Sequence, residues 1–394
     1  MAGVISRGIK APIIKSGDDI IKIVTDSVLH AMDEDGFLLR DGDIVAVTES
    51  VVARADGNYA NVDHIAADVQ SKFGKGKVGL VFPILSRNRF SLTLKGIARG
   101  CEKLVILLSY PSDEVGNHLF SFDDMDAADI DPYKDVLTVS DFRRLFGNCA
   151  HPFTGIDYVE FYESIVKEEG CEVEIIFSNR PEIILNYASN IICCDIHSRE
   201  RTKRRIEKAG GKNLLTLCDI LHEPVSGSGY CPDYGLLGSN KATETTVKLF
   251  PKNAQEVAEG ISAELSSRLG VRVEAMVYGD GAFKDPVGKI WELADPVVSP
   301  GFTEGLSGLP NELKLKYLVD NDYPELSGEE LTQAVRESIK NKDCDLKATM
   351  ASEGTTPRRL TDLIGSLCDL TSGSGDKGTP IIVVQNYFLN FADK

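Results

Sequence analysis

The sequence lacks the patterns that mark several common classes of protein. Its longest apolar runs, among them LVILL and IIVV, are much too short to cross a bilayer. Its nine cysteines are an odd number without a recurring C-x-x-C pair, which argues against a disulfide framework and a zinc ribbon. No H-E-x-x-H or G-x-S-x-G pattern occurs. The first residues contain no apolar signal segment, so we expect a cytoplasmic protein with reduced thiols.

Positive charge is scarce as well. The 43 lysines and arginines are outnumbered by 60 aspartates and glutamates, which gives a net charge of −17. Such a chain repels nucleic acid and anionic membranes at long range, so we expect neither as a partner. A hydrophobic fraction of 42% is typical of globular proteins, and 394 residues exceed what one hydrophobic core usually holds.

The pattern of apolar residues divides the chain into three parts, residues 1–80, 81–225 and 226–394. In the middle part, strand-like runs alternate with helical ones, which predicts an α/β domain. The flanking parts also mix strands with helices, so the predicted fold class is α/β with mixed sheets, in which the middle domain is inserted into a core formed by both ends of the chain.

Local signals predict where several helices and loops begin. Asp18 and Asp19 precede a helical pattern, and Ser16 is available as a cap. Helices are also predicted for AQEVAEGISAELSSRL, residues 254–269, and for residues 328–341. The acidic run FDDMDAADIDPY interrupts the pattern and predicts a surface loop.

Two segments of the first part combine glycine with charged side chains beside predicted strands. Backbone amides near Gly8 can face an anion, and Lys10 can meet a phosphate as a point charge. Glu49 and Arg54 flank the end of a strand, where Arg54 offers a planar fork for phosphate or carboxylate. Each segment alone also fits a solvated surface, so an anion site and a plain surface remain open alternatives.

Two segments of the last part have similar character. Asp280 follows a hydrophobic strand between two glycines, which exposes a carboxylate as a hard-cation ligand requires, and Asp233 can supply a second. The loop TSGSGDKG, residues 371–378, can aim backbone N–H groups at phosphate, although it does not match a Walker A pattern. A simple turn and a flexible linker are the alternatives for these two segments.

In their order along the chain, these segments resemble the coenzyme F420-0:L-glutamate ligase family. RGIKAPIIKSGDD and DGDIVAVTESVVARADG are similar to the family's first two blocks, and CPDYGLLGSN resembles its C-A-N-A-G-V-D-x-S-N. The following helix and strand, up to VEAMVYGDG, and the closing GSGDKGTPIIVV resemble its last blocks. The resemblance covers roughly residues 5–75, 228–290 and 350–388.

The resemblance implies a homodimeric ligase that couples GTP hydrolysis to amide formation between L-glutamate and a carboxylate acceptor, through an acyl phosphate. The expected cofactors are GTP or ATP, Mg²⁺ or Mn²⁺, and K⁺ as a further cation. It implies no particular catalytic residue. By position, the residues implied to contact nucleotide are Gly8, Ile9, Lys10, Glu49, Arg54, Asn240, Gly373, Ser374 and Gly375, and those implied to hold metal are Asp280, Asp233 and Asp376.

The sequence departs from the family pattern at two metal positions. Leu237 stands where the family has a metal-binding aspartate, and Gly281 stands where it has Ser or Thr. Residues 81–225 also replace a short connection. An active ligase with an altered acceptor is therefore one hypothesis, a non-catalytic nucleotide-binding or regulatory relative is a second, and an unrelated enzyme built on residues 81–225 is a third.

Overall fold

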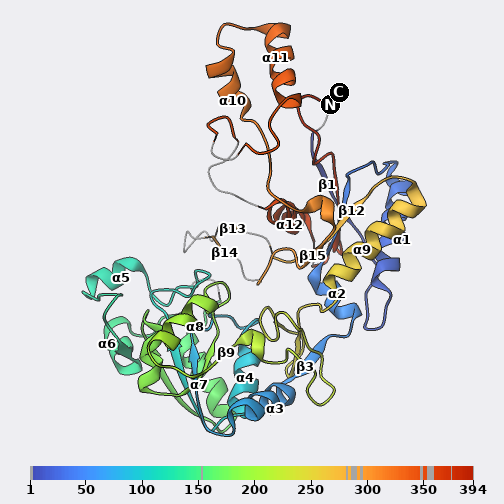
Figure 1. The fold of residues 1–394 in the computed structure, drawn as a ribbon. Coiled ribbons are helices and arrows are strands. Elements are labelled where there is room, and N and C mark those ends of the chain that lie inside the picture. Colours follow the sequence, from blue (N-terminus) through green and yellow to red (C-terminus); the bar gives the residue numbers. More distant parts are fainter. Residues whose placement is uncertain are drawn as a thin grey trace.

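The computed structural model describes residues 3–151, 154–280, 283–284, 291–292, 296–346, 349–352, 359–373 and 375–393. Two separate sheets, each covered by helices, dominate the molecule (Figure 1). Mixed parallel and antiparallel pairing within these sheets confirms the predicted fold class.

The first sheet is built from both ends of the chain. Its strand order is β1-β16-β2-β12-β15, in which β2 and β12 are parallel and the other neighbours antiparallel. We call this sheet with its helices the core. Its strands are β1 (Ile5–Ile9), β2 (Ile44–Thr48), β12 (Glu274–Tyr278), β15 (Gly301–Phe302) and β16 (Ile381–Gln385).

Helices cover both faces of the core sheet, because successive side chains of a strand point to opposite faces. Val45 and Val47 pack with α1 (Ile20–Asp35), α2 (Glu49–Ala55) and α9 (Ala254–Leu269). Ile44 and Ala46 pack with α12 (Leu360–Thr371) on the opposite face. The prediction for residues 254–269 is confirmed, since α9 has these bounds.

Helix α1 begins as predicted after the two aspartates, but its cap differs from the residue suggested by the sequence. Asp19 is the N-cap, and its side chain accepts a hydrogen bond from the Lys22 N–H at 3.0 Å. The hydroxyl oxygen of Ser16 instead lies close to Gly57, 2.3 Å from the position that a Cβ on this glycine would occupy. Ser16 is therefore not the cap, because the chain between it and the helix turns toward the end of α2.

The second sheet has the order β6-β7-β5-β4-β8-β9. All neighbours are parallel except β6, which pairs antiparallel with β7. Numbered along the chain, the parallel strands lie in the order 3-2-1-4-5, which is that of a doubly wound dinucleotide-binding sheet. Its strands are β4 (Lys77–Val81), β5 (Lys103–Leu108), β6 (Leu137–Thr138), β7 (Glu172–Phe177), β8 (Asn190–Cys193) and β9 (Asn213–Thr216).

Helices also cover both faces of the second sheet. One face packs against α3 (Val62–Phe73), α4 (Ser91–Arg99) and α7 (Tyr158–Glu168), and the other against η1 (Pro181–Asn186) and α8 (Arg199–Lys208). Helix α6 (Val139–Phe146) and η2 (Leu217–Asp219) complete this part. We call the chain from α3 to η2 the inserted unit. Because β4 belongs to it, the second sheet begins before residue 81.

One loop prediction in the inserted unit is wrong. Part of the acidic run forms the short helix α5 (Phe122–Ala127). Ser121 caps it, because its hydroxyl accepts from the Asp124 N–H at 3.0 Å while Asp124 accepts from the Ser121 N–H at 3.1 Å. Met125 is the buried residue of this helix. The acidic residues that suggested a loop thus supply the capping box of a helix.

A three-stranded sheet joins the two parts. It consists of β3 (Tyr59–Asn61), β11 (Thr246–Lys248) and β10 (Asn240–Lys241), with β11 in the centre. The chain leaves the core and returns to it at adjacent points, because the Gly229 N–H donates to the Tyr59 carbonyl at 2.7 Å. Val247 and Leu249 pack with the apolar core of the inserted unit, so the joining sheet is fixed to both parts.

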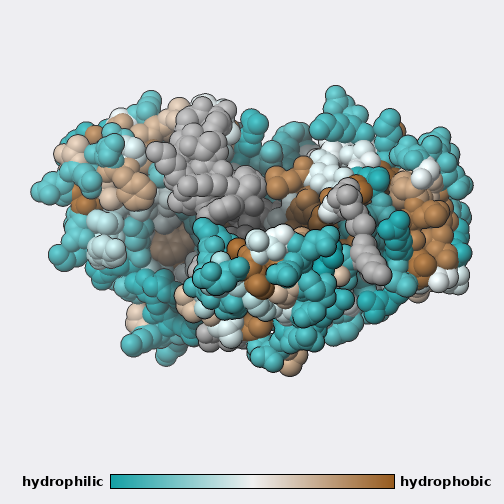
Figure 2. Space-filling model, turned by 90° about the horizontal axis from the view of Figure 1, so that it is seen from above, coloured by the Kyte–Doolittle hydropathy of each residue, from teal (hydrophilic) through white to brown (hydrophobic). Residues whose placement is uncertain are grey.

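The remaining elements are short or peripheral. Helix α11 (Gly328–Lys340) packs with η4 (Leu318–Asp322) at the end of the molecule opposite the second sheet (Figure 1). One face of the molecule is mostly hydrophilic, with hydrophobic residues in small separate patches (Figure 2). Within the described part of the chain, no helix has the length and apolar character needed to cross a membrane. The other elements are β13 (Phe283–Lys284), β14 (Trp291–Glu292), η3 (Glu304–Leu306) and α10 (Leu315–Tyr317).

Candidate functional site

The predicted site segments meet at one edge of the core sheet. Ile9 at the end of β1 lies opposite Ile381 at the start of β16, and Ile381 lies opposite Val47 near the end of β2. Thr48 at the end of β2 in turn pairs with Tyr278 at the end of β12. The ends of β1, β2 and β12 and the start of β16 therefore form one row, although β1 and β2 lie more than 200 residues before β12 in the sequence. We call this row the site edge.

The glycine loop before β16 is tied to the segments on both sides of it. The Ala11 N–H donates to the Gly378 carbonyl at 3.1 Å, and the Thr48 N–H donates to the Pro380 carbonyl at 3.1 Å. A Cβ on Gly8 would lie 3.0 Å from the Cβ of Thr379, so the close approach of β1 to this loop favours glycine there. The structure thus brings the predicted segments around Gly8 and residues 373–376 together.

Within this loop the predicted residues differ in exposure. Gly373 is buried and pairs with Thr379, whereas Gly375 and Asp376 are exposed. Ser374 lies outside the described residues. The exposed backbone and carboxylate of the loop are therefore open to a ligand approaching the site edge.

Glu49 is the first residue of α2 and is almost fully buried at the site edge. A carboxylate is stabilised here because the N-terminus of a helix carries partial positive charge. Its Oε2 lies 3.5 Å from Nζ of Lys248, which also donates to the Ser50 hydroxyl at 2.6 Å. Lys248 on β11 stands opposite Asn240 on β10, and facing residues of an antiparallel pair point to the same side. Glu49, Lys248 and Asn240 are thus brought together.

Sequence reasoning missed Lys248. The only local signal is a charged residue within the apolar strand segment TVKLF, which is more common on a solvated edge. Its side chain is 12% exposed, and its partner Glu49 is 199 residues away in sequence. Only the pairing of β11 with β3, next to α2, reveals the contact.

Asp280 lies two residues beyond the end of β12 and forms an ion pair with Arg89. The Arg89 side chain is 15% exposed and that of Asp280 40% exposed, so the pair is only partly screened by water. Arg89 lies between β4 and α4 and therefore comes from the inserted unit. Sequence reasoning missed this residue too, because 191 positions separate the partners and no motif marks Arg89.

A buried hydroxyl group lies beside these charges. Tyr278 at the end of β12 is buried, and its hydroxyl donates to the Pro380 carbonyl at 3.4 Å. Burial raises the pKa of Tyr278 far above its usual value, and the neighbouring negative charges, Glu49 among them, act in the same direction. Its hydroxyl thus stays protonated and serves the site edge as a fixed donor.

Two residues that were predicted to contact nucleotide do not join the other residues of the site edge. Arg54 is exposed in the last turn of α2. It follows Glu49 by five positions, which places the two side chains about 140° apart around the helix axis. Lys10 is exposed directly after β1. Both cations face solvent in this structure, so their contact with a nucleotide remains a prediction.

The predicted metal ligands do not form a ready cluster. Among the residues that the structure describes, no group of three or more His, Cys, Asp or Glu side chains is placed to hold a metal ion. Asp233 and Asp376 are exposed, and Asp280 is engaged by Arg89. Mg²⁺ usually takes only one or two carboxylates from a protein and completes its shell with water and phosphate, so Asp280 still suits that ion.

The two departures from the family pattern have different outcomes. Leu237 is buried in the apolar core shared with the inserted unit, so a packing residue has replaced the expected ligand. Gly281 lies outside the described residues. Asp233 lies beside Tyr234, whose pKa is raised to about 12 chiefly by burial and further by the charge of Asp233.

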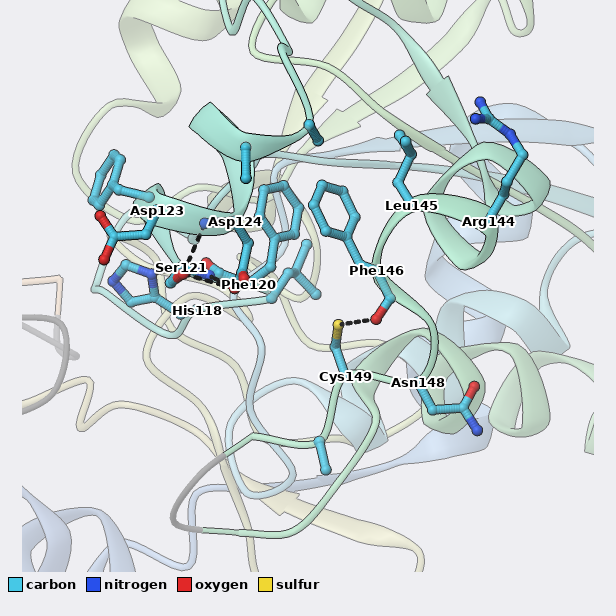
Figure 3. A pocket seen from close by; sticks show the side chains of 15 residues that line it. His118, Phe120, Ser121, Asp123, Asp124, Arg144, Leu145, Phe146, Asn148 and Cys149 are labelled. Carbon is cyan, nitrogen blue, oxygen red and sulfur yellow. Dashed lines mark hydrogen bonds between the residues drawn. The ribbon is translucent and has the colours of Figure 1, made fainter.

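A separate hollow of about 970 Å³ lies in the inserted unit between α5, α6 and the chain after α6 (Figure 3). Phe120 and Phe146 stack inside it with ring centroids 3.9 Å apart, and the Cys149 thiol donates to the Phe146 carbonyl at 3.5 Å. This volume falls within the range of small-molecule pockets, about 300–1,000 Å³. None of the predicted site residues lines the hollow, so it is distinct from the site edge.

Comparison with known proteins identifies the family of the chain. The model of the F420-0:gamma-glutamyl ligase family matches residues 8–386, which is nearly the whole chain. The chain therefore belongs to this family of amide-forming ligases. It is also 33% identical over 69 residues to the coenzyme F420:L-glutamate ligase of Methanothermobacter thermautotrophicus. That match covers 16% of this chain and 26% of the relative, so the chain spans about a quarter of the relative's length.

Proposed function

We propose that the chain is a nucleotide- and divalent-metal-dependent ligase. It would join an amino acid such as L-glutamate to a small carboxylate acceptor through an acyl phosphate. The family and the printed name of the archaeal relative support γ-glutamyl transfer to an acceptor of this kind. The single observation that carries the proposal is the convergence of four distant segments at the site edge.

The exposed backbone at the site edge suits a polyphosphate. The chain after Gly8 lies beside the glycine loop, because the Ala11 N–H donates to the Gly378 carbonyl. The exposed backbone at Gly375 can face phosphate, and Lys248 adds a positive charge beside Asn240. Lys248 also helps to hold the Glu49 carboxylate in place through their ion pair. We propose GTP or ATP as the nucleotide, with the base on the side of Asn240.

Asp280 is the residue best placed to hold a divalent cation. It follows a strand that runs parallel to β2, so it stands beside Glu49 at the carboxyl ends of adjacent strands. Asp376 projects from the loop at the same edge. A bound Mg²⁺ or Mn²⁺ would neutralise charge on the phosphates during transfer. The residues therefore fit a water-rich site with few protein ligands.

Nucleotide binding and turnover test the proposal. Purified protein is titrated calorimetrically with GTP and with ATP in the presence of Mn²⁺, and phosphate release is followed with L-glutamate and a panel of carboxylate acceptors. We expect Asp280→Ala to abolish metal-dependent nucleotide binding. Asp33→Ala removes the same charge from the exposed face of α1 and should bind nucleotide like the unchanged protein.

Failure to bind either nucleotide would refute the proposal, as would binding that is indifferent to Asp280→Ala. Tight binding without turnover on any acceptor would favour a non-catalytic relative, a second function supported by the apolar replacement at Leu237. Sedimentation of the same preparation tests the homodimer that we propose from the family resemblance.

A further inference from the structure

The inserted unit presents its ligand-binding edge to the core. In doubly wound sheets, ligands bind beyond the carboxyl ends of the strands, where the strand order reverses. That point lies between β4 and β8, because β4 has β5 on one side and β8 on the other. The loop of residues 82–90 begins at this point and carries Arg89.

Contacts with the core close this edge. The Lys241 N–H donates to the Asn88 carbonyl at 2.7 Å, and the hydroxyls of Thr93 and Ser239 lie 3.4 Å apart. A small cavity there is lined by Arg89 from the inserted unit together with Gly238 and Ser239 from the segment that leads into β10. The loop 82–90 is therefore fixed against the chain that positions Asn240.

The ion pair between Arg89 and Asp280 joins this loop directly to the site edge. Because Arg89 is mostly buried, its guanidinium is stabilised by the carboxylate of Asp280. A divalent cation that binds Asp280 competes with the guanidinium for the same carboxylate. A nucleotide that arrives with the cation brings phosphate oxygens, which a guanidinium binds as well as it binds carboxylate.

We propose that Arg89 is an exchangeable partner supplied to the site by the inserted unit. Without ligand it neutralises Asp280, and when metal and nucleotide bind it exchanges that carboxylate for a phosphate oxygen. This inference rests on the proposed function. It assigns the inserted unit a role in nucleotide binding.

Opposite shifts in two affinities test the exchange. Mn²⁺ alone is titrated into the full-length protein with detection by electron paramagnetic resonance, and nucleotide is then titrated at saturating Mn²⁺. In Arg89→Gln, Mn²⁺ alone should bind about fivefold more tightly, because the cation no longer displaces a guanidinium. GTP or ATP at saturating Mn²⁺ should bind at least about tenfold more weakly, because a charge-assisted contact is lost.

A matched control separates this role from a change in net charge. Arg87→Gln removes the same charge from an exposed position two residues away, and both affinities should stay within about twofold. Arg89→Lys keeps the charge but loses the planar fork, so its nucleotide affinity should fall between those of the unchanged protein and Arg89→Gln. Thermal unfolding of each variant shows whether it is folded before it is titrated.

Three outcomes of these titrations would overturn the proposed exchange by Arg89. Affinities that both weaken in Arg89→Gln, or that both stay unchanged, would overturn the exchange while leaving the proposed ligase intact. Equal effects in Arg87→Gln would overturn it as well. If the unchanged protein binds neither Mn²⁺ nor nucleotide, the proposed function and this inference both fail.

Discussion

Asn58 holds together three segments at the junction of the core and the inserted unit. Its side chain is 1% exposed. The Nδ2 group donates to the Tyr230 carbonyl at 2.9 Å and to the Phe250 carbonyl at 2.8 Å, and Oδ1 accepts from the Tyr230 N–H at 2.9 Å. These partners lie 172 and 192 residues away in sequence, so the side chain joins the segments through which the chain leaves and re-enters the core. We call these segments, residues 58–62, 229–230 and 249–250, the neck.

Replacing Asn58 by alanine removes the three hydrogen bonds of a buried side chain and leaves their backbone partners unsatisfied. At about 1 kcal/mol for each bond, local opening of the neck should become about 3 kcal/mol easier. Since each 1.4 kcal/mol is a factor of ten, amide exchange at the neck should accelerate about 100-fold. The reporters are the N–H groups of Leu249 and Gly229, whose own acceptors are backbone carbonyls that remain in the variant.

Hydrogen exchange followed by mass spectrometry measures this acceleration under native conditions. Asn213→Ala is the control, because Asn213 is exposed and its hydrogen bond to Asn190 joins two surface side chains. That variant should change exchange at the neck by less than about twofold. An acceleration below about fivefold in Asn58→Ala would refute the reasoning, since it would show that the three bonds do not hold the neck closed.

Two further predictions concern buried charges. Burial raises the pKa of Asp195 to about 6 from its ordinary 3.8, so the folded state binds the proton more tightly than the unfolded chain. The resulting stability is present below about pH 4 and lost as the pH rises through about 6, a change of about 3 kcal/mol in the free energy of unfolding. Urea unfolding from pH 4 to 7 should show this decline, and Asp195→Asn should remove it; an unchanged slope would contradict the assignment. Lys248→Met leaves Glu49 buried beside a lost partner and should cost about 3 kcal/mol, whereas the double variant with Glu49→Gln should recover most of that loss. A double variant as unstable as the single one would show that the pair is not coupled.

The elements that the sequence predicts best are those whose own residues carry the signal. Helix α9 has the predicted bounds because its apolar residues repeat at helical spacing between a loop and a glycine. Helix α5 is harder to predict, because a local cap stabilises only its first turn. The acidic residues that form this cap are also common in loops. Asp19 rather than Ser16 caps α1 because the turn before the helix, not residue type, decides which oxygen faces the free N–H groups.

The candidate site shows where sequence reasoning ends. The segments around Gly8, Glu49 and Asp280 could be found because glycine and charge gather at the ends of strands. Lys248 and Arg89 could not be identified, since the charged partner of each lies about 200 positions away in sequence. Only the register of the sheets brings the partners together. The inserted unit was predicted as α/β, but its strand order, which turns a specific edge toward the core, depends on long-range pairing alone.

The side-by-side neck between residues 58–62 and 229–230 has a consequence for how far the two parts depend on each other. None of the five strands of the core sheet comes from the inserted unit, so the core can close its sheet whether that unit is present or absent. A doubly wound unit can therefore be added or removed at this one place without rethreading the core.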